Sequence, residues 1–187
     1  MSRVLVPLAE GFEEIEAVTV IDLLRRAGVE VVTAGLVPGA VTGSHGIAVV
    51  PDEELEAVLD RHFDMVALPG GMPGAANLAA DERLLAVIRR LADGGRFTAA
   101  ICAAPTVLAK AGLLGGKRAT SFPGFLTAAS APATILSEAP VVEDGTVITS
   151  RGPGTAMDFA LVLIECLEGS SARQEVESRL QRPARAD

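Results

Sequence analysis

The sequence predicts one α/β domain, a doubly wound, flavodoxin-like sandwich whose central sheet is mostly parallel. Two observations lead to this fold class. The chain has 187 residues, about the size of one domain. Short apolar runs alternate along it with helical patterns, the order typical of parallel sheets with helices on both faces. We find no repeat, linker or low-complexity segment, so residues 1–187 are expected to form one domain, with a polar tail from about residue 181.

The first strand–helix–strand unit lies near the N-terminus. Val4–Leu8 is apolar enough to form a buried strand, and a loop follows it. A helix is predicted over 13–27, because its apolar residues recur with helical spacing and Gly28 ends the pattern. Residues 29–34 form the next strand. This spacing indicates a right-handed βαβ unit with parallel strands.

The middle of the chain alternates in the same way. A hairpin is predicted over 41–50, with its turn at 43–46, and a short helical stretch over 53–59. A strand over 64–68, an amphipathic helix over 81–92 and a strand over 97–101 follow. The two strands extend the same sheet.

The last part of the chain closes the domain. The expected elements are a short helix over 105–111, strands over 118–121, 141–142 and 147–150, and helices over 155–167 and 172–180. The uncharged stretch 119–137 is long enough to span a bilayer, but its prolines and glycine interrupt it. We therefore expect loops and a short helix there.

Composition argues against several function classes. The net charge of −8 and the aromatic content of 3%, without Trp or Tyr, argue against a nucleic-acid partner and against a membrane surface. Two cysteines, Cys102 and Cys166, are too few for a disulfide framework, and two histidines are too few for a His-rich metal site. We expect no metal, no cofactor, no targeting segment and a reducing, cytoplasmic setting.

Cys102 is the first candidate functional residue. It lies where the apolar strand 97–101 gives way abruptly to a helix, with small residues on both sides. Such a strand–turn–helix elbow can hold a nucleophile above the carboxyl edge of a sheet, where a helix N-terminus lowers the pKa of the thiol. The alternative is that a lone cysteine in an apolar run simply belongs to the core.

Two other segments are expected at the same edge of the sheet. Glutamates at 13, 14 and 16 follow the first strand, and Gly70 and Gly71 follow the strand over 64–68. A carboxylate beside a thiol should share its proton with the sulfur, and backbone amides after Gly71 and Cys102 could form an oxyanion hole. The alternatives are a charged helix start for the glutamates and a plain turn for the glycines.

Four ordered motifs resemble the ThiJ/PfpI superfamily, and within it the branch of the human parkinsonism-associated protein and bacterial YajL. They are Glu13-Glu14-Ile15-Glu16, Leu68-Pro69-Gly70-Gly71, Ala99-Ala100-Ile101-Cys102-Ala103-Ala104-Pro105 and Ser150-Arg151-Gly152-Pro153-Gly154-Thr155. Together they span nearly the whole chain, which makes the resemblance specific.

The resemblance implies a role for each of these positions. Cys102 would be the reactive nucleophile and Glu16 a protonated acid that hydrogen-bonds its sulfur, while Gly71 and Ala103 would supply oxyanion-hole amides. The implied chemistry is conversion of methylglyoxal to lactate without glutathione, with deglycation of proteins as a disputed extension. The other family theme is oxidation of the cysteine to a sulfinic acid, linked to stress protection and chaperone-like behaviour. A redox sensor or chaperone is therefore the alternative to an enzyme of reactive carbonyls.

The chain departs from the family pattern at two positions. Phe122 stands where several members have a histidine, and His45 stands where others have an arginine after a serine. We therefore place His45, Gly70, Phe122 and Pro153 at the rim of the site, although an exposed turn is an equal alternative for His45. Ala103 follows the nucleophile where protease-like members have a histidine, so peptidase activity is not expected.

The helix over 14–27 carries apolar residues on more than one face. One face must cover the sheet, and the remainder is more apolar than a solvent-facing surface should be. Related family members pair through the equivalent helix, so we expect a two-fold homodimer centred on it. We also expect a low pKa for Cys102, and a buried Cys166 that stays reduced when Cys102 is oxidised.

Overall fold

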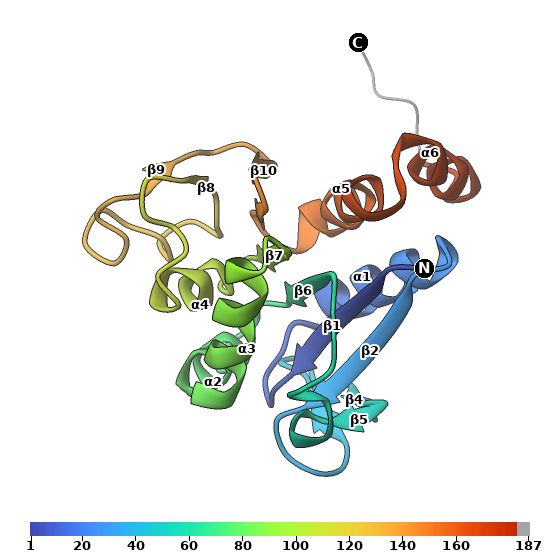
Figure 1. Ribbon diagram of the computed structural model, residues 1–187, viewed down its shortest axis with the longest axis horizontal. Helices are drawn as coiled ribbons and strands as arrows, with labels where there is room; N and C mark the ends of the chain where they lie inside the picture. The colour runs from blue at the N-terminus through green and yellow to red at the C-terminus, as the bar shows by residue number, and fades with distance from the viewer. Residues whose placement is uncertain (183–187) are drawn as a thin grey trace.

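A seven-stranded sheet lies at the centre of the computed structural model, which describes residues 1–182 (Figure 1). The strand order is β10-β11-β7-β6-β1-β2-β5. Their bounds are β1 Arg3–Leu8, β2 Glu30–Gly35, β5 Glu53–Glu54, β6 Met65–Leu68, β7 Phe97–Ile101, β10 Val141–Asp144 and β11 Val147–Ser150. All neighbours are parallel except β10 and β11, so the predicted mostly parallel α/β sheet is confirmed.

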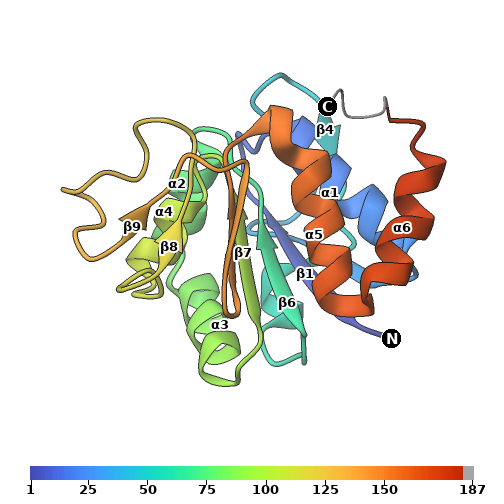
Figure 2. The same cartoon turned by 90° about the horizontal axis from the view of Figure 1, so that it is seen from above.

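Helices cover both faces of this sheet, and the view from above separates the two layers (Figure 2). One layer holds α1 Glu14–Arg26, α5 Ala156–Glu168 and α6 Ser170–Arg179; the other holds α2 Gly74–Ala80, α3 Glu82–Asp93 and α4 Pro105–Lys110. Each layer closes over its own cluster of buried aliphatic side chains. The two clusters stabilise the sheet from both sides by removing apolar surface from water.

Two small sheets lie outside the central one. The predicted hairpin is present as β3 Val41–Thr42 and β4 Ala48–Val49, which pair antiparallel. The strand predicted over 118–121 is shorter, β8 Arg118–Ala119, and pairs parallel with β9 Ile135–Leu136. The short helix expected within 119–137 is wrong, since this stretch consists of turns and bends apart from β8 and β9.

The remaining differences are local. The helical stretch expected over 53–59 is the strand β5 followed by one 3-10 turn, η1 Leu55–Val58. Helix α2 was not expected, because its sequence Gly-Ala-Ala-Asn-Leu-Ala-Ala has almost no apolar periodicity. No helix within residues 1–182 is long and apolar enough to cross a membrane. Most of the predicted polar tail, residues 183–187, lies outside the described residues.

Candidate active site

Cys102 forms the sharp elbow between β7 and the turn before α4. Its φ of 66° is in the left-handed region, which non-glycine residues seldom adopt. Two hydrogen bonds hold this conformation: the Cys102 amide donates to the Ser150 carbonyl over 3.0 Å, and the Phe122 amide donates to the Cys102 carbonyl over 2.9 Å. The residue is 9% exposed, so the protein encloses most of it.

Glu16 projects from the first turn of α1 toward this thiol and is fully buried. Its Oε2 accepts a hydrogen bond from the Gly70 amide over 2.8 Å, while Oε1 has no hydrogen-bond partner among the described residues. Gly70 lies between the two groups. A Cβ added there would lie 2.7 Å from the Cys102 Cβ and 2.8 Å from the Glu16 Oε2. Any larger residue at position 70 would therefore collide with both the Cys102 side chain and the Glu16 carboxyl.

Two backbone amides also contact the sulfur. Hydrogen bonds from the Gly71 and Ala103 amides lower the pKa of the Cys102 thiol, so both amides point at Sγ. Gly71 has a φ of 86°, a conformation that residues with a side chain seldom adopt. Two convergent amides of this kind can stabilise an oxyanion that forms on a substrate bound to the sulfur.

The rim of the site comes from two later segments. The exposed Phe122 ring lies against Gly152, where an added Cβ would lie 3.2 Å from the ring and 4.0 Å from the Cys102 Sγ. Pro153 is the next residue and begins the 3-10 turn η2 Pro153–Thr155. The structure thus places Gly70 and Phe122 beside the thiol. Pro153 directly follows Gly152, the residue that lies near the sulfur. Gly152 was missed, although it lies within the fourth motif.

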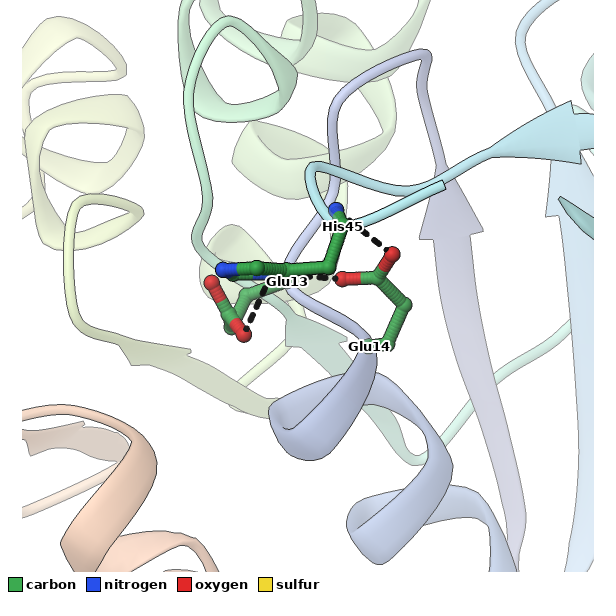
Figure 3. Close-up of side chains that lie close together, drawn as sticks. All are labelled: Glu13, Glu14 and His45. Carbon is green, nitrogen blue, oxygen red and sulfur yellow. Dashed lines mark hydrogen bonds and ion pairs between the residues drawn. The ribbon is translucent and has the colours of Figure 1, made fainter. Parts of the chain in front are cut away.

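His45 lies at the tip of the β3–β4 hairpin, over the start of α1 (Figure 3). Its Nδ1 is 3.4 Å from the Glu13 Oε1 and 3.2 Å from the Glu14 Oε2, and its side chain is 70% exposed. Burial opposes ionisation of Glu14, but amides that include those of His45 and Ile47 outweigh it and lower the pKa of Glu14 to about 2. The Glu14 carboxylate therefore fastens the hairpin to α1.

The same three side chains bear on the expectation of no metal. Within residues 1–182, Glu13, Glu14 and His45 are the group whose donor atoms lie close enough to share a cation. Glu14 also accepts hydrogen bonds from the His45 and Ile47 amides, and its Oε2 lies 3.2 Å from the His45 Nδ1.

The family assignment follows from comparison with known proteins. The family model described as "DJ-1/PfpI family" matches residues 2–166. The chain belongs to the DJ-1/PfpI family. It is 44% identical over 177 residues to protein dj-1beta of Drosophila melanogaster, covering 94% of this chain and 95% of that protein. The structure titled "Toxoplasma gondii DJ-1, oxidized" superimposes with a TM-score of 0.93 at 39% identity, covering 98% of this chain and 100% of that one.

A further relative bears a name that states a reaction. The Caenorhabditis elegans protein "Glutathione-independent glyoxalase DJR-1.2" is 36% identical over 160 residues, which covers 86% of this chain and 85% of that protein. Two DJ-1 homologues from Arabidopsis thaliana are longer, and the chain covers 46% and 41% of their lengths.

In this member of the DJ-1/PfpI family, the acid and the thiol shift each other's ionisation. Burial raises the pKa of Glu16 from 4.5 to about 7, and the charge of Glu13 adds to this, while hydrogen bonds from Gly70 and Cys102 oppose it. Burial, together with the Glu16 carboxylate, raises the pKa of Cys102 to about 12. Two adjacent acids resist losing both protons, so the pair keeps at least one proton at neutral pH.

The lowered thiol pKa expected from the sequence is therefore wrong for a thiol that faces an ionised Glu16. Helix α4 has only six residues, and burial of the sulfur outweighs the amides that favour its charge. The Glu16 carboxylate is among the causes that raise the pKa of the thiol, so protonation of Glu16 removes one of the charges that oppose a thiolate at Cys102.

Cys166 also differs from the expectation. It is half-buried rather than buried, and its Sγ lies 3.6 Å from the Glu143 Oε2. Burial and the adjacent Glu143 carboxylate raise the pKa of this thiol to about 12. Cys166 is therefore more accessible than predicted.

Proposed function

We propose that the chain converts reactive dicarbonyls such as methylglyoxal to 2-hydroxy acids such as lactate, without glutathione and without a cofactor. The observation that carries this proposal is the placement of the Cys102 sulfur, between two backbone amides and beside a buried acid whose pKa is about 7. An acid that titrates near neutrality can both give and take a proton during the reaction. The name of the Caenorhabditis elegans relative supports the same reaction.

In the proposed mechanism the Cys102 sulfur adds to the aldehyde carbon of methylglyoxal and gives a hemithioacetal. The amides of Gly71 and Ala103 stabilise the oxygen that becomes negative during the addition. Glu16 then takes the proton from that carbon and returns it to the neighbouring carbon, which turns the hemithioacetal into a lactyl thioester. Water cleaves the thioester, so methylglyoxal and water yield lactate and the free thiol. No atom is gained or lost apart from that water.

The test is lactate formation from methylglyoxal by the wild-type chain and four variants. Cys102→Ser should abolish turnover, and Glu16→Gln should lower kcat by at least about a hundredfold, since general acid–base catalysis contributes that much or more. Cys166→Ser and Glu54→Gln change residues away from the site and should retain wild-type rates. Stoichiometric loss of the Cys102 thiol with no lactate from the wild-type chain would overturn the proposal.

That result would favour the second candidate, a redox sensor or chaperone that acts through oxidation of Cys102. The similar Toxoplasma gondii structure is titled as an oxidized form, which supports a reactive cysteine. In this function Cys102 passes through sulfenic to sulfinic acid, and the amides that face Sγ would accommodate the added oxygens. Stress protection, protein deglycation and a cytoplasmic location remain part of the proposal.

We further propose that two copies pair through α1. Its buried face packs against the sheet and α5, while Ile15 and Val18 remain 57% and 48% exposed on the opposite face. Exposed aliphatic side chains on one helix face are typical of an isologous contact. Glu16 lies on the same helix, so pairing would also stiffen the start of α1 next to the site.

A further inference from the structure

A small space beside the Cys102 sulfur lies next to Gly152. A Cβ built on Gly152 would lie 4.0 Å from the Cys102 Sγ and 3.2 Å from the nearest carbon of the Phe122 ring. Among the described residues, and apart from the two chain neighbours of Gly152, only Phe122 has atoms nearer to this point than the sulfur. The absence of a side chain at position 152 therefore leaves room for little more than one carbon atom between an aromatic ring and the nucleophile.

The substituent of a dicarbonyl substrate matches this space. In the proposed reaction the sulfur adds to the aldehyde carbon, and the methyl group of methylglyoxal is then three bonds from the sulfur. A carbon atom three bonds away lies at a distance similar to that between the Cys102 Sγ and the Cβ position of Gly152. The methyl group can therefore occupy the space beside Gly152 while its neighbouring carbons react.

We propose that Gly152 and Phe122 determine which dicarbonyls the site accepts, and that they favour 2-oxoaldehydes whose substituent is apolar and no larger than a methyl group. This inference rests on the proposed dicarbonyl reaction. The Phe122 ring makes the space apolar as well as small, because it carries no hydrogen-bonding group. A hydroxylated substituent, such as that of a sugar-derived dicarbonyl, would lose its hydrogen bonds to water there.

The size limit requires that Gly152 stays in place, and Thr155 holds both of its backbone groups. The Gly152 amide donates to the Thr155 Oγ1 over 3.1 Å, and the Thr155 amide donates to the Gly152 carbonyl over 2.9 Å. The Thr155 Oγ1 also lies 2.7 Å from the Oγ of Ser150, the residue whose carbonyl accepts from the Cys102 amide. Thr155 acts on the substrate through Gly152 and is therefore a positioning residue.

The structure allows an alanine at position 152 without a change of fold. Gly152 has an extended backbone, with a φ of 162°, which residues with a side chain also adopt. The added Cβ requires the Phe122 ring to move by a few tenths of an ångström, and the ring is 45% exposed, so it can move toward solvent. Gly154→Ala is the matched control, because it adds the same methyl group two residues away, where nothing lies within 4 Å.

The experiment compares kcat/KM for glyoxal, methylglyoxal and phenylglyoxal, which should give glycolate, lactate and mandelate. Gly152→Ala should lower the ratio of methylglyoxal to glyoxal about tenfold or more, because one carbon in an apolar pocket changes kcat/KM by that much. Gly154→Ala should keep the wild-type ratio. Adding Phe122→Ala to Gly152→Ala should restore the ratio toward that of the wild type, because the ring that the new methyl group faces is gone.

The variants of Phe122 and Thr155 test the other side of the space and its support. Phe122→Ala alone should raise kcat/KM for phenylglyoxal relative to methylglyoxal. Thr155→Val removes the hydroxyl that holds Gly152 and should raise the same ratio, while Thr155→Ser keeps the hydroxyl and should not. The inference is refuted if Gly152→Ala leaves the ratio of methylglyoxal to glyoxal unchanged, or if Gly154→Ala lowers it equally.

A second readout does not depend on turnover. Iodoacetamide and the bulkier N-phenylmaleimide react with the chain at one pH, and mass spectrometry of the Cys102 peptide gives both rates. Gly152→Ala should slow N-phenylmaleimide more than iodoacetamide, and Phe122→Ala should favour N-phenylmaleimide. If the wild type forms no lactate but these rates change as stated, the dicarbonyl reaction fails while the size limit stands. If lactate forms but neither variant changes the relative rates, the size limit fails while the reaction stands.

Discussion

Replacing Glu16 by Gln should stabilise the folded chain, and the gain should grow with pH. In the unfolded chain the carboxyl loses its proton near its ordinary pKa of 4.5, but in the folded chain only near 7. Between these values the folded state binds more protons, so its stability falls as pH rises. The interval from 4.5 to about 7 corresponds to about 3 kcal/mol at 1.36 kcal/mol for each pH unit. Gln stays neutral and can still accept from the Gly70 amide, so it avoids this loss.

The assay is urea unfolding of wild type and Glu16→Gln between pH 5 and 8, at one protein concentration and under reducing conditions. The difference in the free energy of unfolding should be small at pH 5 and reach about 3 kcal/mol by pH 8. The Cys102 thiol does not contribute in this range, because its pKa lies at or above 9 in both states. The exposed Glu54→Gln provides the control and should show no such trend. Parallel pH profiles for wild type and Glu16→Gln would show that Glu16 titrates alike in both states, which refutes the buried acid.

Three further predictions concern the site and the surface. Gly70→Ala forces a Cβ against Cys102 and should lower the free energy of unfolding, measured in urea, by about 1–3 kcal/mol. The same change should slow alkylation of Cys102, measured by mass spectrometry. Unchanged alkylation would show that the close contact between Gly70 and Cys102 does not matter for the thiol. Mild peroxide should add two oxygens to the Cys102 peptide and leave Cys166 reduced, whereas equal oxidation of both would contradict the elbow assignment. Sedimentation should show a dimer that Val18→Lys converts to a 19.2 kDa species, while a wild-type monomer at micromolar concentration would exclude pairing through α1.

Much of the central fold could be predicted because its elements carry strong patterns. The strands β1, β6 and β7 are short apolar runs, and α3 has a regular apolar stripe, so each was placed within one or two residues. Helix α2 could not be found this way. It consists mostly of glycine and alanine, and its Leu78 is buried in the same apolar cluster as Leu84 and Leu85 of α3.

The candidate site, like the fold, could be predicted only in part. The alternation of strands and helices placed the three glutamates, the two glycines and Cys102 at one edge of the sheet in advance. The family resemblance then singled out Glu16 among the glutamates. The protonation of Glu16 and Cys102 could not be predicted, because the pKa of the thiol depends on its burial and on the distance to one carboxyl, and a sequence gives neither. The hydrogen bond from the His45 amide to Glu14 could not be predicted either. It joins α1 to a hairpin that lies outside the central sheet, and the sequence does not say where that hairpin packs.

The hydrogen bond from the Cys102 amide to the Ser150 carbonyl has a consequence for how the protein is made. Ser150 is translated 48 residues after Cys102 (150 − 102), so until then the β7 edge is open and the Cys102 amide lacks its strand partner. The hydrogen bond that holds the turn at Cys102 can form only after β11 has been synthesised. In a nascent chain, or in one truncated before β11, the Cys102 thiol would therefore lack the neighbours that bury it in the folded protein. The same cysteine would be exposed during synthesis and buried afterwards.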